Sequence, residues 1–309
     1  MSKKNSEDPG SWFAEPPLRG FQQRFRTTHR LWHQRSAYQT VEIYETVPFG
    51  RILVLDGAVQ TTQRDEFIYH EMLALVPLIS HGCPASVAIV GGGDGGTLRR
   101  VLACPTVTRV VQVELDPVVT DVCRQYLPEI AAGSFSDPRV QLIFGDGAQF
   151  LQQAEEAFDV ILVDSTDPVG PALVLFSEAF YRSASRALRP GGLIVTQSGS
   201  PFLMPEELRR TAANMRQAFP LVRTYLALVP SYPGVVWSFT LGSTGPDPLA
   251  LSLEAVEERL AQWRLSPRYY TPAVHFAAFA LPAFLSQGCR GDSRYDLLPA
   301  DETLSEQQA

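Results

Sequence analysis

Several carboxylates in this sequence stand directly after short apolar segments, a pattern that can hold cations. In chain order they are Asp94, Glu114, Asp146 and Asp164, and Asp167 follows the last of them after two residues. Two acids this close on a short Pro/Gly-rich loop can face one site, which suits holding a diamine and accepting a proton from it. A helix cap for Asp167, or a turn at the end of a strand for Asp164, is the structural alternative.

The glycine-rich segment around the first acid matches a nucleotide-binding motif. Gly91, Gly93 and Gly96 satisfy G-x-G-x-x-G, in which a backbone without side chains approaches a ligand closely. Glu114 follows about 20 residues later, where an acid accepts hydrogen bonds from both ribose hydroxyls of a nucleoside. The alternative for Glu114 is an acid at the start of a helix ahead of Pro117.

Asp94 discriminates between classes of nucleoside ligand. In a dinucleotide-binding site the glycine loop faces a pyrophosphate, and a carboxylate there would place like charges within a few Å. The methionine carboxylate of S-adenosylmethionine would be disfavoured in the same way. Decarboxylated S-adenosylmethionine presents an aminopropyl ammonium beside a sulfonium, and Asp94 suits this ligand best. Asp146 could accept from the exocyclic amine of its adenine, or could form a plain turn.

Composition excludes several other chemistries. Only two of the 26 basic residues are lysines, Lys3 and Lys4, so the body of the chain offers no lysine for a Walker-A loop, a pyridoxal Schiff base or an amine nucleophile. The formal net charge of −7 argues against binding to nucleic acid or to an anionic membrane. His29 and His33 could share a helix face but have no third ligand nearby, and the four cysteines form no C-x-x-C pair. We therefore expect no metal and no cofactor.

An α/β fold has to position these acids. From Ser86 onward short apolar strands alternate with helices, which predicts a mostly parallel sheet covered on both faces. Two runs at 222–228 and 235–241, joined by a Pro/Gly turn, predict a closing antiparallel hairpin. Residues 38–60 alternate and turn in the manner of a small β-domain, and residues 65–79 change to a helical period.

Four parts of the chain follow from these patterns. Residues 1–30 are expected to be a poorly structured or variable N-terminal extension, 31–64 an N-terminal β-domain, 65–290 a Rossmann-like catalytic domain and 291–309 a polar C-terminal tail. The N-terminus has no apolar signal-like segment, and no stretch approaches the roughly 18 apolar residues of a membrane span. The sequence therefore predicts a cytoplasmic protein with no membrane partner.

Four segments of the chain resemble the bacterial type of the spermidine synthase, or polyamine aminopropyltransferase, family. They are LDGAVQTT at 55–62, RDEFIYHE at 64–71, GGGDGG at 91–96 and DSTDPVGP at 164–171, and the likeness extends over residues 38–285. The resemblance implies a methyltransferase-like Rossmann domain behind a small β-domain, and a homodimer or homotetramer. It implies two small-molecule substrates, putrescine and decarboxylated S-adenosylmethionine, the second a co-substrate rather than a cofactor.

Carried over residue by residue, the resemblance implies two groups of contacts. The group for the methylthioadenosine part of the donor is Gln39, Gly91, Gly93, Glu114, Asp146, Gly147 and Pro171. The group for the polyamine is Tyr69, His70, Asp94, Asp164, Ser165, Thr166, Asp167 and Tyr232, with Asp94 on the aminopropyl ammonium and Asp164 as the catalytic proton acceptor. His70 departs from the glutamine of many eukaryotic members but is familiar in bacterial ones.

The implied reaction transfers the aminopropyl group to putrescine and gives spermidine and 5'-methylthioadenosine. A deprotonated amine attacks the carbon beside the sulfonium in line. Cadaverine, agmatine or spermidine as acceptor stays open, because acceptor length depends on the back of a channel that a sequence does not show. A methyltransferase that uses S-adenosylmethionine and a catalytically silent paralogue are the alternatives from other classes. The silent paralogue is disfavoured because no acid of the motifs is missing.

Overall fold

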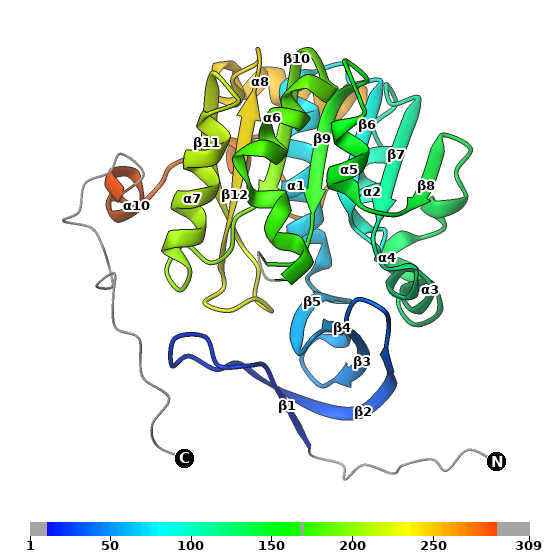
Figure 1. The fold of residues 1–309 in the computed structure, drawn as a ribbon. Coiled ribbons are helices and arrows are strands. Elements are labelled where there is room, and N and C mark those ends of the chain that lie inside the picture. The colour runs from blue at the N-terminus through cyan, green and yellow to red at the C-terminus, as the bar shows by residue number, and fades with distance from the viewer. Residues whose placement is uncertain (1–10, 168–169, 289–309) are drawn as a thin grey trace.

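The computed structural model describes residues 11–167 and 170–288, without the side chains of residues 171 and 286–288. The described chain forms a small antiparallel sheet followed by a larger, mostly parallel sheet with helices on both faces (Figure 1). The predicted α/β class is confirmed, as are the closing antiparallel hairpin and the N-terminal β-structure.

The N-terminal sheet is a meander in which each strand pairs with the next one along the chain. Every pairing is antiparallel, and the spatial order is the chain order. Asp56 and Gly57 form the tight turn between the last two strands, and both have positive φ, as the sequence signal predicts. The strands are β1 (Trp12–Ala14), β2 (Arg24–Arg35), β3 (Thr40–Thr46), β4 (Gly50–Leu55) and β5 (Ala58–Thr62).

The expectation of a poorly structured extension over residues 1–30 is wrong for the strands β1 and β2. Only Phe25 and Thr27 are buried among the twelve residues of β2, so the strand carries almost no apolar alternation. Two register shifts interrupt its pairing with β3, after Thr27 and after Arg30, and such bulges break the period of two that identifies a strand. His29 also lies on this strand rather than on a helix. Residues 1–10 lie outside the described part.

The large sheet has the spatial order β11-β12-β10-β9-β6-β7-β8. Its strands are parallel except β12, which runs antiparallel between β10 and β11. The chain order reverses direction between β6 and β9, which places the ends of these strands at a topological switch point. The strands are β6 (Ser86–Gly91), β7 (Arg109–Glu114), β8 (Val140–Phe144), β9 (Phe158–Asp164), β10 (Leu188–Gln197), β11 (Leu221–Leu228) and β12 (Val236–Ser243).

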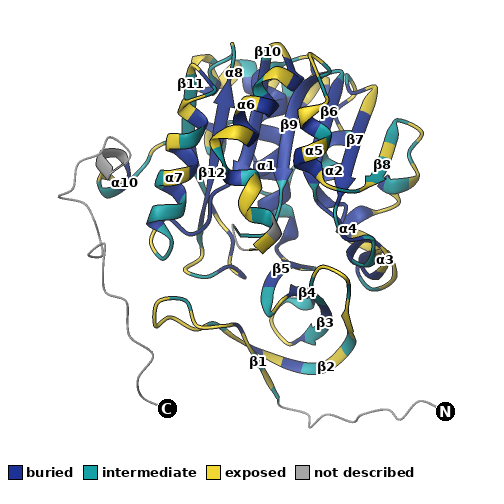
Figure 2. Ribbon diagram, viewed as in Figure 1, coloured by how far each residue is buried: buried dark blue, intermediate teal, exposed yellow. Residues whose placement is uncertain are grey.

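Helices cover the large sheet on both faces and bury its central strands, as the dark blue arrows of Figure 2 show, while β8 at one side of the sheet is only partly buried. On one face α1 (Glu66–His81), α2 (Gly96–Leu102), α8 (Leu253–Gln262) and α9 (Pro272–Ala277) pack on one apolar cluster. On the other face α5 (Gly147–Gln152), α6 (Glu178–Ala187) and α7 (Pro205–Arg216) pack on a second cluster. The remaining helices are α3 (Pro117–Tyr126), α4 (Pro128–Ala131), α10 (Ala283–Gly288) and the short 3-10 turns η1 (Ser134–Ser136), η2 (Gly170–Phe176) and η3 (Pro248–Ala250).

The two sheets are joined by an apolar interface beside α3. Val41, Ile43 and Leu53 of the N-terminal sheet pack against Val119 and Val122 of α3. The boundary expected between residues 64 and 65 falls between β5 and α1. No helix among residues 11–167 and 170–288 is both long and apolar enough to cross a membrane. The tail expected at 291–309 lies outside the described residues.

Glu71 gives a test of how the C-terminal segment is held. This side chain is fully buried on α1, and its two oxygens accept hydrogen bonds from the backbone N–H groups of Arg268, Tyr269 and Tyr270 at 3.0, 2.8 and 3.0 Å. Glu71→Ala leaves three backbone donors, of which that of Tyr270 is buried and the other two part-buried, without this acceptor. We expect the free energy of unfolding to fall by about 3 kcal/mol, measured by chemical denaturation.

The control is Glu178→Ala on α6, because Glu178 is exposed and pairs only with Arg182 four residues along. We expect this variant to lose about 0.5 kcal/mol at most. Equal losses for the two variants would show that the three hydrogen bonds to Glu71 do not stabilise the fold.

Candidate active site

The carboxyl ends of β9, β6 and β7 lie next to one another at the edge of the large sheet that faces the N-terminal sheet (Figure 1). Gly91 pairs with Asp164 between β6 and β9, and Val90 pairs with Val113, the neighbour of Glu114, between β6 and β7. The fold therefore brings together the glycine-rich loop and two of the predicted acids, which are far apart in the sequence.

Each glycine of the G-x-G-x-x-G motif makes room for a group of the site. A Cβ atom at Gly91, whose φ is +83°, would lie 2.2 Å from the backbone oxygen of Asp164. A Cβ at Gly93 would lie 2.9 Å from Oε2 of Glu114, and a Cβ at Gly96 would lie 2.2 Å from Cε1 of His70. The three glycines are thus required by close packing of the loop against these residues, in addition to any approach of a ligand.

Glu114 forms one end of the site. It is 7% exposed, and its Oε1 accepts a hydrogen bond from the backbone N–H of Asp116 at 2.9 Å. Burial raises the pKa of Glu114 to about 7. Asp116, which the sequence analysis did not single out, caps α3 and accepts hydrogen bonds from the Ser36 hydroxyl at 2.7 Å and the Gln39 amide at 3.2 Å. Gln39 therefore reaches this end of the site from the N-terminal sheet.

Asp146 lies at the end of β8 and caps α5. Its Oδ1 accepts from the backbone N–H groups of Ala148 and Gln149 at 2.8 and 3.2 Å, so the residue caps a helix rather than forming the plain turn that was the alternative. A Cβ atom at Gly147 would lie 2.5 Å from Cγ1 of Val90, so α5 begins directly against β6. Contacts of either residue with a nucleoside stay a prediction. The side chain of Pro171 lies outside the described part of the chain.

His70 and Asp94 meet at the centre of the site. Nε2 of His70 lies 3.3 Å from Oδ2 of Asp94, and the other oxygen of Asp94 accepts from the backbone N–H of Gly96 at 2.8 Å. Nδ1 of His70 lies 2.7 Å from Oε2 of Glu66, one helical turn earlier on α1. Oε1 of Glu66 accepts from the guanidinium of Arg99 at 2.6 Å. Arg99, Glu66, His70 and Asp94 thus form a row of side chains whose charges alternate in sign.

The charges of these neighbouring side chains determine the protonation of His70 and Asp94. Burial by itself would lower the pKa of His70, but the carboxylates of Asp94 and Glu66 outweigh it and raise the pKa to about 10. Burial would raise the pKa of Asp94, yet His70 and the hydrogen bond from Gly96 hold it below the ordinary value. The two carboxylates thus favour the imidazolium form of His70, and His70 in turn favours the carboxylate form of Asp94.

The donor atoms of His70, Asp94 and Asp164 lie within 4.8 Å of one another, a spacing that some metal sites share. Both ring nitrogens of His70 face carboxylate oxygens, so the imidazolium has no lone pair to offer a cation. This arrangement favours an amine over a metal ion as the ligand of the two acids. The absence of a metal cofactor stays a prediction.

Asp164 is the acid best placed to take a proton. Its Oδ2 accepts a hydrogen bond from the Thr97 hydroxyl at 2.7 Å, and Tyr69 donates a second hydrogen bond to the same carboxyl group. Burial and the nearby charge of Asp94 raise the pKa of Asp164 above its ordinary value, while His70 and the two hydroxyl donors act in the opposite direction. The carboxylate is oriented and made more basic than an exposed aspartate.

Two tyrosines wall the same space. The rings of Tyr69 and Tyr232 pack edge to face with their centroids 5.7 Å apart, and the Tyr232 hydroxyl donates to the backbone oxygen of Gln60 at 2.6 Å. The loop that carries Tyr232 is held by Asp65, which accepts from the backbone N–H of Ser231 at 2.8 Å. The predicted position of the two tyrosines beside Asp164 therefore has a structural basis, and their contact with a polyamine stays a prediction.

Asp167 belongs to a row of acids formed by Asp94, Asp164, Asp167 and Glu15, which we call the acidic row. The amide of Gln197, at the end of β10, lies 3.3 Å from its Oδ1, and the same amide donates to the backbone oxygens of Ser165 and Thr166 at 3.4 and 3.2 Å. Burial raises the pKa of Asp167 to about 6. Ser165 and Thr166 turn their hydroxyls toward the neighbouring backbone.

Glu15 approaches this end of the site from the residue after β1. It is 6% exposed, and its Oε1 accepts from the backbone N–H of Val59 at 2.7 Å. Its Oε2 is buried without a hydrogen-bond partner among the described residues. Burial, joined by the charge of Asp167, raises the pKa of Glu15 to about 7. A carboxylate in this state is a ready acceptor for a cationic ligand.

Sequence reasoning missed Glu15, Glu66, Thr97, Asp116 and Gln197. Glu66 could have been found, because it lies four residues before His70 on a predicted helix. Gln197 ends a predicted strand and meets the same criterion as the acids that were chosen. Glu15 gave no signal, because it lies in the segment that was expected to be an extension.

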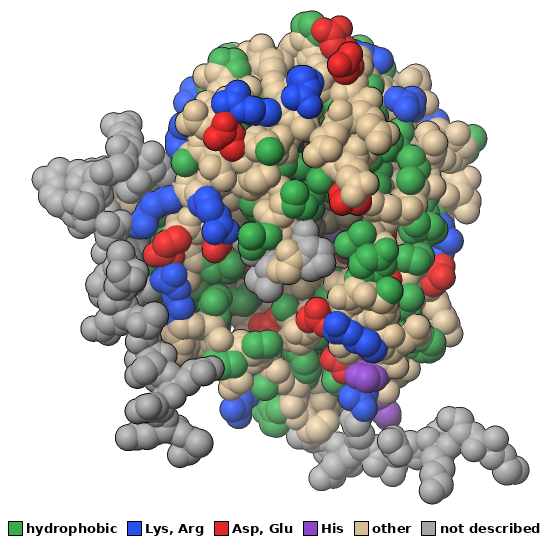
Figure 3. Space-filling view, in the orientation of Figure 1, with side chains coloured by type: hydrophobic (Ala, Val, Ile, Leu, Met, Phe, Trp, Pro, Cys, Tyr) green, Lys and Arg blue, Asp and Glu red, His purple; other side chains and the backbone are tan. Residues whose placement is uncertain are grey.

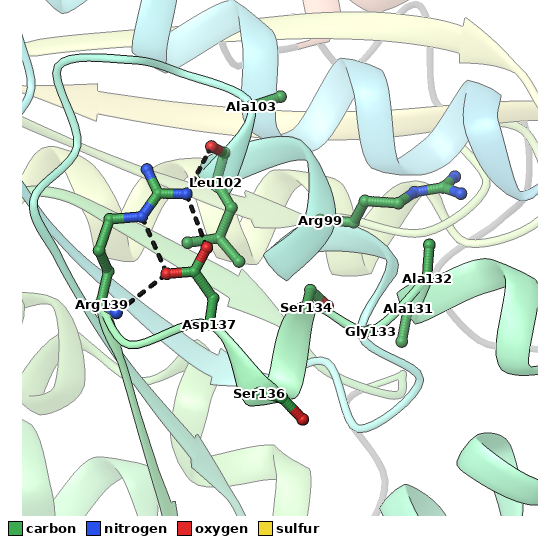
Figure 4. Close-up of a pocket in the computed structure, with 10 residues that line it drawn as sticks. All are labelled: Arg99, Leu102, Ala103, Ala131, Ala132, Gly133, Ser134, Ser136, Asp137 and Arg139. Carbon is green, nitrogen blue, oxygen red and sulfur yellow. Dashed lines mark hydrogen bonds and ion pairs between the residues drawn. The ribbon is translucent and has the colours of Figure 1, made fainter.

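The outer surface carries a second hollow, separate from the acidic row. A cavity of about 410 Å³ lies beside α2 and α4 and is lined by residues that include Arg99, Ser134 and Arg139 (Figure 4). Arg139 donates to Asp137 and to the backbone oxygen of Leu102, and it lies apart from the guanidinium of Arg99. On the face drawn in Figure 3, arginines are interspersed with acidic and apolar side chains and form no continuous basic patch.

The fold and site together define a class: a Rossmann-like domain of methyltransferase topology whose strand ends carry buried and half-buried acids, next to a small N-terminal sheet. Comparison with known sequences agrees with this class. The family description "Spermine/spermidine synthase domain" matches residues 66–249, and "Spermidine synthase tetramerisation domain" matches residues 11–63.

Individual relatives cover almost the whole chain. Polyamine aminopropyltransferase 1 of Pseudomonas aeruginosa is 44% identical over 275 residues, which are 89% of this chain and 96% of that protein. Polyamine aminopropyltransferase of Desulforudis audaxviator is 44% identical over 279 residues, 90% of this chain and 99% of that protein.

Solved structures agree as well. A crystal structure of spermidine synthase with the transition-state analogue AdoDATO has a TM-score of 0.88 and 33% identity, and the match covers 94% of this chain and 99% of that one. Spermidine synthase from Thermotoga maritima has a TM-score of 0.84 and 32% identity, and the match covers 94% of this chain and 98% of that one. The chain belongs to the spermine/spermidine synthase family of polyamine aminopropyltransferases, and the resemblance seen in the sequence is confirmed.

Gly96→Ala tests the packing of the glycine loop. The new Cβ would overlap the imidazole of His70, so the ring must leave its place between Glu66 and Asp94. We expect the pKa of His70, followed by NMR of labelled histidine, to fall from about 10 towards the ordinary value for histidine.

Gly145→Ala is the matched control, because a Cβ at Gly145 meets nothing within 4 Å. We expect this variant to leave the titration of His70 unchanged. A titration of His70 that is unchanged in Gly96→Ala as well would refute the contact.

Proposed function

We propose that this protein transfers the aminopropyl group of decarboxylated S-adenosylmethionine to putrescine and releases spermidine and 5'-methylthioadenosine. The observation that carries the proposal is the row of acids at and beside the strand ends, in which Asp94 and Glu15 are buried and Asp164 and Asp167 are half-buried, next to the buried Glu114. Support comes from the relatives named polyamine aminopropyltransferase and from the related spermidine synthase solved with a transition-state analogue.

The donor is assigned to the end of the site near Glu114. The Glu114 carboxylate accepts from the ribose hydroxyls, which replaces water lost on burial and lowers its raised pKa. Gln39 and Asp146 approach from either side for the adenosine part, with Gly147 beside the adenine. The aminopropyl ammonium then lies against Asp94. The carboxylate that would repel the pyrophosphate of a dinucleotide attracts this ammonium.

The chemical step is a displacement at carbon. Asp164 accepts a proton from the attacking ammonium of putrescine, and the freed nitrogen lone pair forms the new N–C bond. The C–S bond breaks in line, and its electron pair returns to sulfur, which makes the methylthioadenosine neutral. Thr97 and Tyr69 fix the orientation of the Asp164 carboxylate for this transfer.

Electrostatic repulsion between two cationic substrates is the main obstacle to this reaction. The buried carboxylates offset it, because charge interactions in a water-poor cleft exceed those in bulk water. Holding the amine and the reacting carbon in line supplies much of the remaining rate enhancement.

Putrescine as the acceptor is favoured by the second pair of acids. Burial raises the pKa values of Asp167 and Glu15, the charge of Asp167 adds to the effect on Glu15, and a cation would lower both values. A diamine with one nitrogen at Asp164 and the other at this pair satisfies both. We further propose a cytoplasmic homodimer or homotetramer, in keeping with the tetramerisation domain matched at residues 11–63.

The proposal is tested by incubating the purified protein with decarboxylated S-adenosylmethionine and, separately, putrescine, cadaverine, agmatine and spermidine. We expect methylthioadenosine to form fastest with putrescine. Faster product from another amine changes the acceptor and keeps the mechanism. Methylation with intact S-adenosylmethionine, or no product with any amine, would overturn aminopropyl transfer.

Asp164→Asn tests the proton acceptor. The amide keeps the size and the hydrogen bond from Thr97 but cannot accept a proton at neutral pH. We expect kcat to fall by about 10²- to 10⁴-fold with putrescine, while binding of methylthioadenosine, measured by calorimetry, stays within about two-fold. A near-normal kcat would remove Asp164 from this role.

A further inference from the structure

His70 is a cation beside the acids that we assign to cationic ligands. Its two ring nitrogens face two different carboxylates, Glu66 at 2.7 Å and Asp94 at 3.3 Å, and the residue is 2% exposed. Each contact is satisfied by an N–H donor, because an ionised carboxylate only accepts. Before a cationic ligand binds, the imidazolium therefore supplies the positive charge that Asp94 requires.

An ammonium group bound to Asp94 supplies this positive charge in place of His70. The charged groups that face His70 or its two partners come from every element packed around it. They are Glu66 on α1, Asp94 in the glycine loop, Arg99 and Arg100 on α2, and Asp164 at the end of β9, while Tyr69 and Tyr232 contribute neutral hydroxyls. With the substrate bound, a charged His70 would lie against a second cation while sharing the same acid.

We propose that His70 gives up the proton on Nε2 when the aminopropyl ammonium of the donor binds Asp94, and that Glu66 keeps the proton on Nδ1. The proton passes to solvent or buffer, and no other bond changes. The freed lone pair on Nε2 then points at the new ammonium and accepts a hydrogen bond from it. This inference rests on the proposed function, since it requires an aminopropyl donor in the site.

Glu66 is a positioning residue in this scheme. Its Oε2 holds the Nδ1 proton of His70, while Arg99 at 2.6 Å and Arg100 at 3.5 Å keep the carboxylate ionised. Burial would raise the pKa of Glu66, but His70 and the two arginines lower it below the ordinary value. A neutral His70 therefore has one allowed tautomer, with its lone pair directed into the site.

The proposal fixes the sign of a pH dependence. Since the pKa of His70 is about 10, most of the protein must lose a proton from His70 to bind the donor at neutral pH. The affinity for decarboxylated S-adenosylmethionine relative to that for methylthioadenosine therefore rises with pH, by up to about ten-fold per unit between pH 6.5 and 8.5. Methylthioadenosine lacks the ammonium, so its affinity carries only the titration of Glu114, which both ligands share.

The test is titration calorimetry of the full-length protein with decarboxylated S-adenosylmethionine and with methylthioadenosine, each in phosphate and in Tris buffer at pH 7.5. The dependence of the measured heat on the buffer gives the number of protons released. We expect about one more proton for the donor than for methylthioadenosine. The imidazole nitrogen shifts of labelled His70 should change from charged to neutral with the donor alone.

Three variants separate His70 from its neighbours. His70→Gln removes the titrating ring, and we expect the difference between the two ligands to vanish. Glu66→Gln removes one of the two carboxylates that hold the charge, so proton release falls at a given pH. Glu178→Gln on α6, paired only with Arg182, keeps the full difference.

Failure of this inference and failure of the proposed function give different results. Donor binding without extra proton release, or with a release that persists in His70→Gln, overturns the role of His70 and leaves aminopropyl transfer intact. In the second case the proton comes from Asp164. Absence of any binding or turnover of decarboxylated S-adenosylmethionine overturns the proposed function, and this inference falls with it.

Discussion

Buried carboxylates repel one another and are costly to desolvate, and this constraint governs the strand ends of the large sheet. Three acids at these ends, Glu114, Asp164 and Asp167, and Glu15 of the N-terminal region have pKa values raised chiefly by burial. Asp94 is the exception, because the protein places its own cation beside it. Hydrogen bonds from hydroxyl and amide donors partly offset the raised pKa values of the other acids but bring no positive charge to them. The acids are therefore held in a state that a cationic ligand stabilises. Their raised pKa values say more about the charge of the ligand than the net charge of the chain does.

The sequence was sufficient for the part of the fold in which periodicity and strand ends are informative. Apolar runs of β6, β7 and β9 predicted a parallel sheet, and its geometry alone required Asp94, Glu114 and Asp164 to meet. It failed for β2, where bulges and charged side chains conceal the strand. It could not find Glu15, because the position of that residue depends on pairings between strands rather than on any local pattern.

Several residues of the site also stabilise the fold, so a substitution at one of them affects both the site and the stability of the protein. Asp116 caps α3 and at the same time binds Ser36 and Gln39, so a single carboxylate joins the N-terminal sheet to the end of β7. Asp146 caps α5 in a similar way. The glycines of the loop serve packing against Asp164, Glu114 and His70, so the motif describes the interior of this site as much as a ligand.

Glu15 has a consequence for how such a site can change over time. It directly follows β1, and the charge of Asp167, some 150 residues later in the Rossmann domain, contributes to its raised pKa. Apart from Gln39, the groups assigned to the reacting carbon and to the adenosine lie on the large sheet or close to it, whereas Glu15 follows a strand of the separate N-terminal sheet. Under the proposed function, substitutions around β1 therefore alter the charge at the acceptor end of the site and leave Asp164 and Glu114 unchanged.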